Sequence, residues 1–269
     1  MAKVRPFLKW AGGKYRCLDQ ILSSLPKGKR LIEPFTGSGV IFLNANYPSY
    51  LLGEGNVDLI HLFHHVQNEG DSFIQDAQKY FCEANNHEAV YYDLRNQFNL
   101  STDQRQRSLL FLYLNRHGYN GLCRYNLSGG YNVPFGRYKK PYFPLTELMQ
   151  FHLKSKNSTI LHNDYQTTFL NAEQGDVIYC DPPYVPLSKT SNFSSYTSKK
   201  FGEAEQLILA RLAKEAANRG IAVVISNHDT PFTRQHYKGS KIHSFPVQRN
   251  ISCNSESRIQ ARELIAVFR

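Results

Sequence analysis

The sequence of 269 residues lacks the features of a membrane protein, a disulfide-stapled fold or a structural zinc domain. It has no apolar run long enough to cross a bilayer, and its first residues lack the apolar core and cleavage site of a signal peptide. Its five cysteines are odd in number and scattered, and they form no CxxC pair, which argues against a disulfide framework or a zinc site. We therefore expect a reduced, cytoplasmic protein.

Acidic residues are absent from one long stretch of the chain. Residues 104–146 hold no Asp or Glu and seven basic residues, so +7 of the net charge of +10 lies in 43 of the 269 residues. The basic residues of this stretch are Arg105, Arg107, Arg116, Arg124, Arg137, Lys139 and Lys140. Positive charge gathered in one region predicts a polyanionic partner such as nucleic acid.

The sequence also lacks a complete phosphate-binding motif. The segment EPFTGSG of residues 33–39 places Gly37 and Gly39 where an expected strand turns into a helix, and glycines there let a ligand approach the backbone closely. The segment lacks the third glycine of a dinucleotide fingerprint, and the chain has no GKS or GKT phosphate loop. Glu54 lies fifteen residues beyond Gly39, at the end of the next expected strand.

An acid at the position of Glu54 can accept hydrogen bonds from both hydroxyls of a ribose. The alternative is a simple surface acid between Gly53 and Gly55. The first interpretation predicts a nucleoside ligand without a pyrophosphate, for which S-adenosylmethionine is the obvious candidate.

The segment FLKWAGGK, residues 7–14, is a second candidate for the ligand site. It contains the one Trp of the chain, Trp10, beside two glycines and Lys14. A Trp-Gly-Gly segment can lie along a nucleoside, with Lys14 facing a carboxylate. The same residues also suit a packed N-terminal turn.

The most informative segment is Asp181-Pro182-Pro183-Tyr184, which follows the apolar run VIYC of residues 177–180. The run is typical of a buried strand, and the prolines end it because they cannot donate to a β ladder. The carboxyl end of a strand is the edge where open α/β sheets bind ligands. A carboxylate, free carbonyls and an aromatic ring at this edge suit a planar amine, since they supply acceptors for its N–H groups and a ring to stack on it.

Hydrophobic runs and turn residues predict an α/β fold. The expected strands cover residues 30–35, 50–52, 159–162, 177–180, 221–226, 242–247 and 264–268, and the expected helices cover residues 40–43, 203–219 and most of 57–115. Residues 116–144 are rich in Tyr, Gly and Asn, which favours a hairpin. We expect a catalytic domain of residues 1–56 and 145–269, interrupted by a target-recognition domain of residues 57–144 with its hairpin at about 116–144.

Two further segments have more than one interpretation. Residues 185–200 are rich in Ser, Thr and Lys, so they fit either a linker or a lid that closes over substrate, with Phe193 and Tyr196 as contacts. His61, His64 and His65 have the i, i+3, i+4 spacing of a metal site on a helix. We interpret them as surface histidines of an amphipathic helix, because the expected chemistry needs no metal.

With FLKWAGGK, EPFTGSG, the basic Tyr-rich segment and DPPY in that order, the chain resembles the Dam family of N6-adenine DNA methyltransferases. The resemblance runs from about Arg5 to the last expected strand. It includes residues 112–116, 119–126, 132–144 and 225–229. Agreement of this length is far more specific than DPPY alone.

The resemblance implies a Rossmann-like methyltransferase sheet, mostly parallel with an antiparallel edge. It also implies S-adenosylmethionine as methyl donor, S-adenosylhomocysteine as product, and adenine in double-stranded GATC as target. The candidate cofactor-binding residues are Trp10, Lys14, Glu33, Phe35, Gly37, Gly39, Glu54, Asp164, Tyr165 and Asp181. The family usually has Asp where this chain has Glu54, so the longer side chain is expected to reach the ribose differently.

For catalysis, we expect the N–H groups of the target amine to donate to the Asp181 carboxylate and the Pro182 carbonyl. This localises the lone pair on nitrogen and aims it at the methyl carbon, so positioning and electrostatics do most of the work. Tyr184 would stack on the base, which must leave the duplex to be reached.

For DNA recognition, the resemblance implies that Arg124 reads a guanine, that Leu122 and Pro134 touch the thymine, and that Lys9 helps at the outer guanine. Tyr119 would insert into the base stack near the position that the adenine leaves, and Asn120 and Tyr138 are further candidate DNA-binding residues. The residues expected at phosphates, which fix register without reading sequence, are Arg95, Arg116, Asn126, Asn132, Arg137 and Lys139.

Other functions stay open at the level of sequence. An N4-cytosine or RNA adenine methyltransferase shares the acid-Pro-Pro-aromatic chemistry, and a non-catalytic sequence-specific DNA-binding protein would keep the basic segment. We expect a nucleoid-associated protein of bacterial or phage type that contacts no membrane and is a monomer in solution, with more than one copy able to bind a duplex. DNA replication, mismatch repair and restriction-modification are associations of the family.

Overall fold

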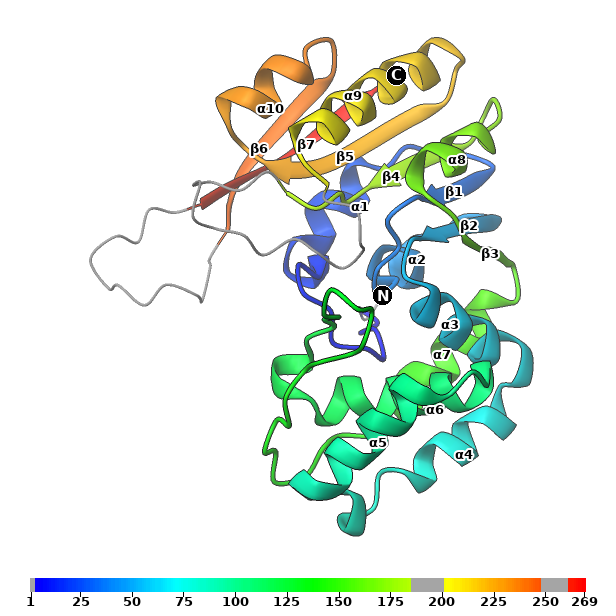
Figure 1. The fold of residues 1–269 in the computed structure, drawn as a ribbon. Helices are drawn as coiled ribbons and strands as arrows, with labels where there is room; N and C mark the ends of the chain where they lie inside the picture. Colours follow the sequence, from blue (N-terminus) through cyan, green and yellow to red (C-terminus); the bar gives the residue numbers. More distant parts are fainter. Residues whose placement is uncertain (1–2, 185–200, 248–260) are drawn as a thin grey trace.

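A seven-stranded sheet forms the centre of the computed structural model, which describes residues 3–184, 201–247 and 261–269 (Figure 1). The strands are β1 (Arg30–Glu33), β2 (Ser49–Glu54), β3 (Ser158–His162), β4 (Val177–Cys180), β5 (Ala222–His228), β6 (Lys241–Val247) and β7 (Ala261–Phe268). Each overlaps a strand expected from the sequence. Their order is β3-β2-β1-β4-β5-β7-β6. β1 to β5 pair in parallel, and β7 runs antiparallel to β5 and β6, so the predicted mostly parallel sheet with an antiparallel edge is confirmed.

Helices cover both faces of this sheet. The α-helices are α1 (Leu18–Ser24), α2 (Val40–Asn44), α3 (Val57–Glu69), α4 (Asp71–Lys79), α5 (Glu88–Leu100), α6 (Gln104–His117), α7 (Leu145–Ser155), α8 (Tyr165–Leu170), α9 (Glu203–Asn218) and α10 (Pro231–His236), and the 3-10 helices are η1 (Lys14–Cys17), η2 (Glu83–Asn85) and η3 (Tyr119–Gly121). None of the helices in the described ranges is long and apolar enough to span a membrane. The expected lid, with Phe193 and Tyr196, lies outside the described residues.

β4 shows why this sheet is buried on both sides. Side chains alternate along a strand, so Val177 and Tyr179 enter the hydrophobic cluster that includes α1, α2 and α3. Ile178 and Cys180 enter the opposite cluster, which includes α8 and α9. All four are at most 2% exposed. The wholly apolar run is therefore a central strand between two helical layers.

α3 joins the sheet to the helices α4, α5 and α6, which lie away from it (Figure 1). It begins after Asn56, whose side chain accepts a hydrogen bond from the Leu59 N–H. It packs on β2 and β3 and also on α6. Phe63 of α3 belongs to the same buried cluster as Leu52 of β2 and Leu110 of α6. The segment expected to recognise the target thus shares a continuous core with the sheet.

Residues 118–136 form an antiparallel excursion in place of a regular hairpin. Isolated bridges pair Gly118 with Phe135 and Tyr125 with Tyr131. The ladder is interrupted because Asn120 has a φ of +52°, in the left-handed region that breaks β geometry. The expected reversal of the chain is present, and its backbone is held both by backbone hydrogen bonds and by side chains.

Candidate active site

The two principal motifs meet at the carboxyl edge of the sheet, between β1 and β4. β1 lies between β2 and β4, so the strand order reverses at this point. Such a switch point opens a crevice outside the carboxyl ends of the strands, where open α/β sheets bind ligands. Residues 33–39 include the end of β1 and the turn after it, and residues 181–184 follow β4. The fold therefore brings both motifs to one place.

Asp181 is held by a cation and a hydroxyl group. The Lys14 ammonium lies 3.0 Å from Asp181 Oδ1, and the exposed fractions of the two side chains are 7% and 21%. Ser226 of β5 donates to the same oxygen at 3.1 Å. Burial raises the pKa of the Asp181 carboxyl, and Lys14 and Ser226 oppose that rise. Lys14, expected to face a ligand carboxylate, thus pairs with a carboxylate of the protein itself.

Tyr184 is oriented from several sides. Its hydroxyl donates to Glu263 Oε2 of β7 at 3.3 Å, and its ring meets the His228 ring edge-on at 4.4 Å between centroids. The Lys14 ammonium lies 4.4 Å from the centre of the ring. Burial, with the nearby Asp181 and Glu263 carboxylates, raises the pKa of Tyr184 well above its usual value, so the phenol stays neutral. A base that stacks on the face contacted by Lys14 has to displace the ammonium.

Ser226 and Tyr179 are site residues that sequence reasoning missed. The Tyr179 hydroxyl lies 2.9 Å from Ser226 Oγ, and both residues are buried beneath Asp181. Ser226 lies in the segment of residues 225–229 that agrees with the family, but its type alone does not indicate a contact with Asp181. The pairing of β4 with β5 creates that contact.

The glycine turn after β1 contacts the N-terminal segment. Gly37 has a φ of +50°, and a Cβ added to it would lie 3.1 Å from Cδ1 and Nε1 of Trp10. Gly39, with a φ of +72°, precedes α2. The positive φ at both positions favours glycine. The FLKWAGGK and EPFTGSG segments therefore form one wall of the crevice.

Glu54 spans the turn from the neighbouring strand. Its Oε2 accepts from the Gly37 N–H at 3.0 Å and its Oε1 from the Asn56 N–H at 3.1 Å. Burial raises the pKa of Glu54, and these backbone donors oppose the rise. The longer side chain, where the family usually has Asp, thus reaches back to the backbone of the turn. Each oxygen keeps a second lone pair for another donor.

Glu33 is the most buried acid of the site. It is 1% exposed, and among the described residues its Oε1 has no hydrogen-bond partner. Burial raises its pKa to about 8, and the Phe42 N–H only partly opposes this rise. The group is therefore protonated at neutral pH.

An aromatic cluster lies beyond the ends of β1 and β3. Phe35 stacks on Tyr165 with centroids 5.3 Å apart and planes 23° apart, and Phe201 meets Phe35 edge-on. Asp164 caps α8 by accepting from the Thr167 N–H at 2.8 Å. The predicted pair Asp164-Tyr165 is thus at the same edge as Glu54, and the Tyr165 ring is 7% exposed and lies against the half-buried Phe35.

Lys9 lies against the excursion of residues 118–136. Its N–H and C=O both bond to the Asn115 side chain, at 2.9 and 2.8 Å. Its ammonium lies 4.1 Å from the centre of the Tyr138 ring. A Cβ on Gly121 would overlap the Lys9 side chain, so glycine is required for this close approach. The N-terminal segment and the predicted DNA-reading residues therefore form one surface.

Arg124 is exposed and held by Asn132. Its Nε donates to Asn132 Oδ1 at 2.7 Å and its Nη2 to the Asn132 carbonyl at 3.0 Å. Asn132, predicted at a phosphate, thus orients the predicted guanine reader in this state. Tyr119, Asn120 and Pro134 are also exposed on this excursion, and Leu122 is half-buried.

Three other predicted phosphate ligands make contacts within the protein. Arg95 donates to the Val133 carbonyl at 3.0 Å, and Arg116 donates to the Tyr142 carbonyl at 3.1 Å. The Asn126 side chain accepts from two backbone N–H groups of its own turn. The exposed basic residues Arg137 and Lys139 remain the better candidates for phosphate contacts, and Arg137 also pairs with Glu88 at 3.3 Å.

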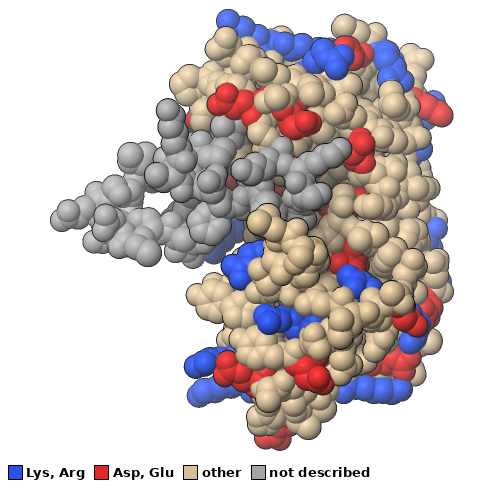
Figure 2. Space-filling view, in the orientation of Figure 1, with Lys and Arg blue, Asp and Glu red and all other residues tan. Residues whose placement is uncertain are grey.

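The acid-free stretch is partly neutralised by the fold. Arg105 bonds to Glu69 and Asp76 at 2.7 and 2.8 Å, and Arg107 bonds to Asp58 at 2.7 Å. These acids come from α3 and α4, outside residues 104–146. In Figure 2 Lys and Arg side chains lie in the middle of the face, between the grey residues and the helices at the bottom, with acidic side chains close to several of them. The excess charge available to a polyanion is smaller than the sequence suggests.

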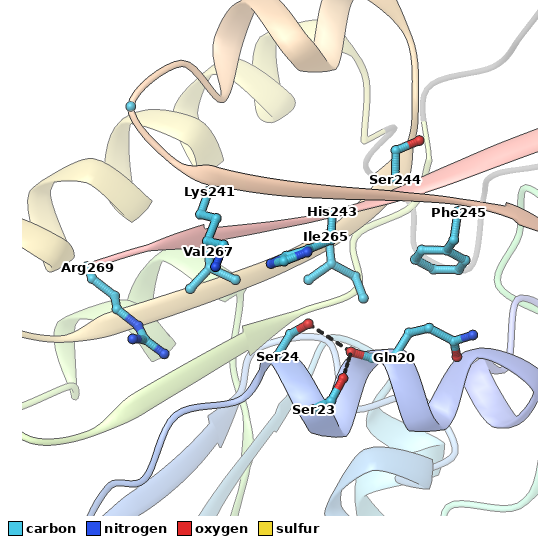
Figure 3. Close-up of a pocket in the computed structure, with 11 residues that line it drawn as sticks. Gln20, Ser23, Ser24, Lys241, His243, Ser244, Phe245, Ile265, Val267 and Arg269 are labelled. Atoms are coloured by element: carbon cyan, nitrogen blue, oxygen red, sulfur yellow. Dashed lines mark hydrogen bonds between the residues drawn. The ribbon is translucent and has the colours of Figure 1, made fainter.

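One described pocket lies away from this crevice. It has a volume of about 550 Å³ and lies between α1 and the strands β6 and β7 (Figure 3). Val267, in its wall, pairs with Val224 near the amino end of β5, whereas Asp181 follows the carboxyl end of β4. It contains none of the predicted site residues. The described ranges also hold no group of three or more His, Cys, Asp or Glu residues suited to a metal, and His65 bonds to Glu69 at 2.7 Å.

Known proteins are similar to this chain over its whole length. The model of the family described as D12 class N6 adenine-specific DNA methyltransferase matches residues 10–251. The chain is 48% identical to the DNA adenine methylase of Escherichia coli (strain K12), over 100% of this chain and 97% of that protein. It is 49% identical to the DNA adenine methylase of Vibrio cholerae serotype O1, with 100% and 97% covered, and 49% identical to that of Serratia marcescens, with 100% of both covered.

Proposed function

The chain belongs to the D12 class N6 adenine-specific DNA methyltransferases, and from this premise we propose that it transfers a methyl group to N6 of adenine in double-stranded GATC. The observation that carries the proposal is Asp181, ion-paired and 21% exposed, at the carboxyl edge of β4. Full-length identity of 48% to a DNA adenine methylase supports adenine as the target. The exposed Arg124 beside Asn132 supports the reading of a guanine.

The crevice residues fit S-adenosylmethionine as methyl donor. The backbone at Gly37 is open to close approach beside Trp10, and Glu54 offers two carboxylate oxygens at the end of β2. Phe35 and Tyr165 offer an apolar surface for the adenine ring. Lys14 is the cation nearest to Asp181 and to the Tyr184 ring, so it can also attract the carboxylate of the ligand. The bound ligand supplies an electrophilic methyl carbon, and the protein must hold the target amine in line with it.

The protein activates the target amine by accepting hydrogen bonds. The nitrogen lone pair of adenine is delocalised into the ring, which makes the amine a poor nucleophile. Asp181 and the Pro182 carbonyl accept from its two N–H groups and favour the tetrahedral form in which the lone pair is localised. Ser226 donates to one oxygen of the carboxylate and can hold it in place while the Lys14 ammonium moves off the Tyr184 ring to admit the base. The everted base stacks against the Tyr184 ring.

Target recognition belongs to residues 57–144 together with Lys9. Arg124 reads a guanine, Leu122 and Pro134 contact the thymine methyl, and Tyr119, 51% exposed, enters the stack that the adenine leaves. Because α3 shares its core with the sheet, this recognition region is held rigidly beside the crevice.

The decisive experiment compares Asp181→Ala with the wild-type protein in transfer of labelled methyl from S-adenosylmethionine to duplexes that differ only within GATC. Wild type should label the adenine of GATC, and Asp181→Ala should bind DNA normally while transfer falls by at least about 100-fold. Asp19→Ala, at an exposed acid, is the matched control and should be fully active. Near-normal turnover by Asp181→Ala, or label on cytosine or RNA, would refute the assignment.

A further inference from the structure

We propose that Gln206 of α9 is a positioning residue for methyl transfer, which holds the Pro183 carbonyl and thereby fixes the two acceptors of the target amine. The inference rests on the proposed function, since it concerns the geometry of Asp181 and the Pro182 carbonyl. It starts from a buried polar cluster behind the Asp-Pro-Pro-Tyr segment, made of Gln206, Asn227 and Tyr237.

The cluster is buried, and its side chains are joined by hydrogen bonds. Gln206, Asn227 and Tyr237 are 1%, 0% and 1% exposed. Gln206 Nε2 donates to the Pro183 carbonyl at 2.7 Å. Asn227 Nδ2 donates to Gln206 Oε1 and to the Tyr237 hydroxyl, both at 3.0 Å. The Asn227 Oδ1 accepts from the His228 N–H at 2.8 Å.

This network permits one orientation of the Gln206 amide. The Pro183 carbonyl can only accept, so the NH₂ group of Gln206 must face it. The carbonyl of Gln206 then faces the Asn227 NH₂, which can only donate. Each member is therefore satisfied in a single arrangement, and a buried network of this kind is rigid.

The catalytic segment needs such an anchor because its prolines cannot supply one. The pairing of β4 with β5 ends at Cys180 and Ile225. Pro182 and Pro183 have no N–H, so neither can donate a hydrogen bond that would tie the backbone down beyond that point, and only their carbonyls can accept one. The Pro183 carbonyl is thus a fixed point for the backbone between Asp181 and Tyr184. An error of about 1 Å in the placement of reacting groups can cost on the order of 100-fold in rate.

The test uses Gln206→Glu, because protonation of the introduced carboxyl decides whether the anchor exists. In its neutral form the carboxyl donates from its O–H to the Pro183 carbonyl and still accepts from Asn227. In its ionised form it can only accept, so the bond to Pro183 is lost. Relative to wild type at the same pH, kcat should fall about 10- to 100-fold at pH 8.5 and recover to within a few-fold at pH 6. KM for DNA and for S-adenosylmethionine should change by less than about 3-fold.

Other titrating groups cancel in this ratio. The titratable groups near the cluster include Tyr237, Cys180, His228, Glu205, Asp181 and Tyr184, and all are present in both proteins. Gln235→Glu, the same chemical change at an exposed position of α10, is the matched control and should keep a ratio near one at both pH values. Thermal unfolding at each pH shows whether the variants are folded.

Gln206→Leu provides the second comparison. It cannot donate at any pH, so its loss of kcat should persist at pH 6. Three outcomes would overturn the inference. The ratio of kcat for Gln206→Glu to kcat for wild type does not change with pH, folded Gln206→Leu keeps full kcat, or the loss is confined to KM. If the wild-type protein transfers no methyl group to adenine, the proposed function fails instead, so the two failures are distinguishable.

Discussion

At the scale of single residues, the three acids of the crevice are held in three different ways. Asp181 has a cation and a hydroxyl, and Glu54 has two backbone N–H groups. Glu33 is buried with one oxygen unpartnered among the described residues. An isolated buried carboxylate is expensive, so the proton stays on Glu33, whereas Asp181 keeps a charge partner beside it. Two carboxyl groups of one crevice thus differ in charge state because their surroundings differ.

Glu33 makes the stability of the protein depend on pH. Its pKa is about 8 in the folded state against a usual 4.5, so between these values the folded protein holds a proton that the unfolded chain releases. The free energy of unfolding should therefore fall as pH rises from 4.5 to 8, by at most about 1.4 kcal/mol per pH unit. Glu33→Gln removes this dependence. The free energy of unfolding of the variant, measured in urea, should therefore rise relative to that of wild type between pH 5 and pH 8. A difference that is the same at both pH values would mean that Glu33 is ionised in the folded protein.

Arg124 and Asn132 allow specificity to be separated from affinity. Arg124→Ala should lower discrimination against a substituted guanine by about 1–3 kcal/mol in kcat/KM. Asn132→Ala should lower discrimination at the same base pair by a smaller amount, because the guanidinium loses its bond to the Asn132 side chain but keeps its bond to the backbone carbonyl of residue 132. The measurement is methylation of GATC and of duplexes with single substitutions. Equal losses on cognate and substituted DNA would argue that both residues bind phosphate.

At the scale of elements, the site depends on how short segments end. β1 ends in a turn where Gly37 lets the Trp10 ring approach the backbone, and β4 ends in two prolines. Each ending was predictable, because missing side chains and missing N–H groups are local properties. The excursion of residues 118–136 is different, since its path depends on side chains such as Asn99, which bonds to both backbone groups of Tyr131.

Gly37→Ala tests the turn as an element. The substitution puts a Cβ on a residue with a φ of +50°, which strains the backbone by about 1–2 kcal/mol. The Cβ would also lie 3.1 Å from the Trp10 ring, so the indole has to move. We expect binding of S-adenosylmethionine, measured by calorimetry, to weaken about 10-fold or more. Binding of DNA should change much less.

Gly129→Ala is the control for backbone strain. Its φ is +81°, but an added Cβ has nothing within 4 Å. It should lower stability by a similar amount and leave the affinity for S-adenosylmethionine unchanged. Equal weakening by both variants would attribute the effect to general destabilisation.

At the scale of the whole molecule, basic residues serve two purposes that the sequence does not separate. Arg107 bonds to the buried Asp58 and to the Phe98 carbonyl at 2.7 Å, so it ties α6 to α3 and α5. Lys139 is exposed, three residues beyond the excursion of residues 118–136. Only the second kind of residue can neutralise phosphates.

Lys139→Ala should therefore affect DNA binding, whereas Arg107→Ala should affect stability. Lys139→Ala should weaken binding to all DNA sequences alike and reduce the slope of log K against log salt by about one, with unchanged stability. Arg107→Ala leaves a buried carboxylate unpaired, so it should lower the free energy of unfolding by about 3–5 kcal/mol. Fluorescence anisotropy across a salt series and urea unfolding measure the two effects. Reversed outcomes would contradict this division of roles.

The amino-acid sequence by itself determined the strands, the two motifs and the family. Apolar runs, prolines and glycines act through local sterics and backbone hydrogen bonding, so their positions alone assign VIYC-DPPY and EPFTGSG to strand ends. All seven strands and the candidate residues Asp181, Glu54 and Trp10 follow from such patterns.

Only the tertiary structure decided which side chains meet. The pairing of β4 with β5 brings Ser226 to Asp181, the N-terminal segment brings Lys14 to the same carboxylate, and α9 brings Gln206 to Pro183. The fold also assigns Arg105 and Arg107 to acids from distant helices. These contacts join residues far apart in the chain, so no local spacing encodes them. They depend on strand order and on helix packing, which the hydrophobic core sets as a whole.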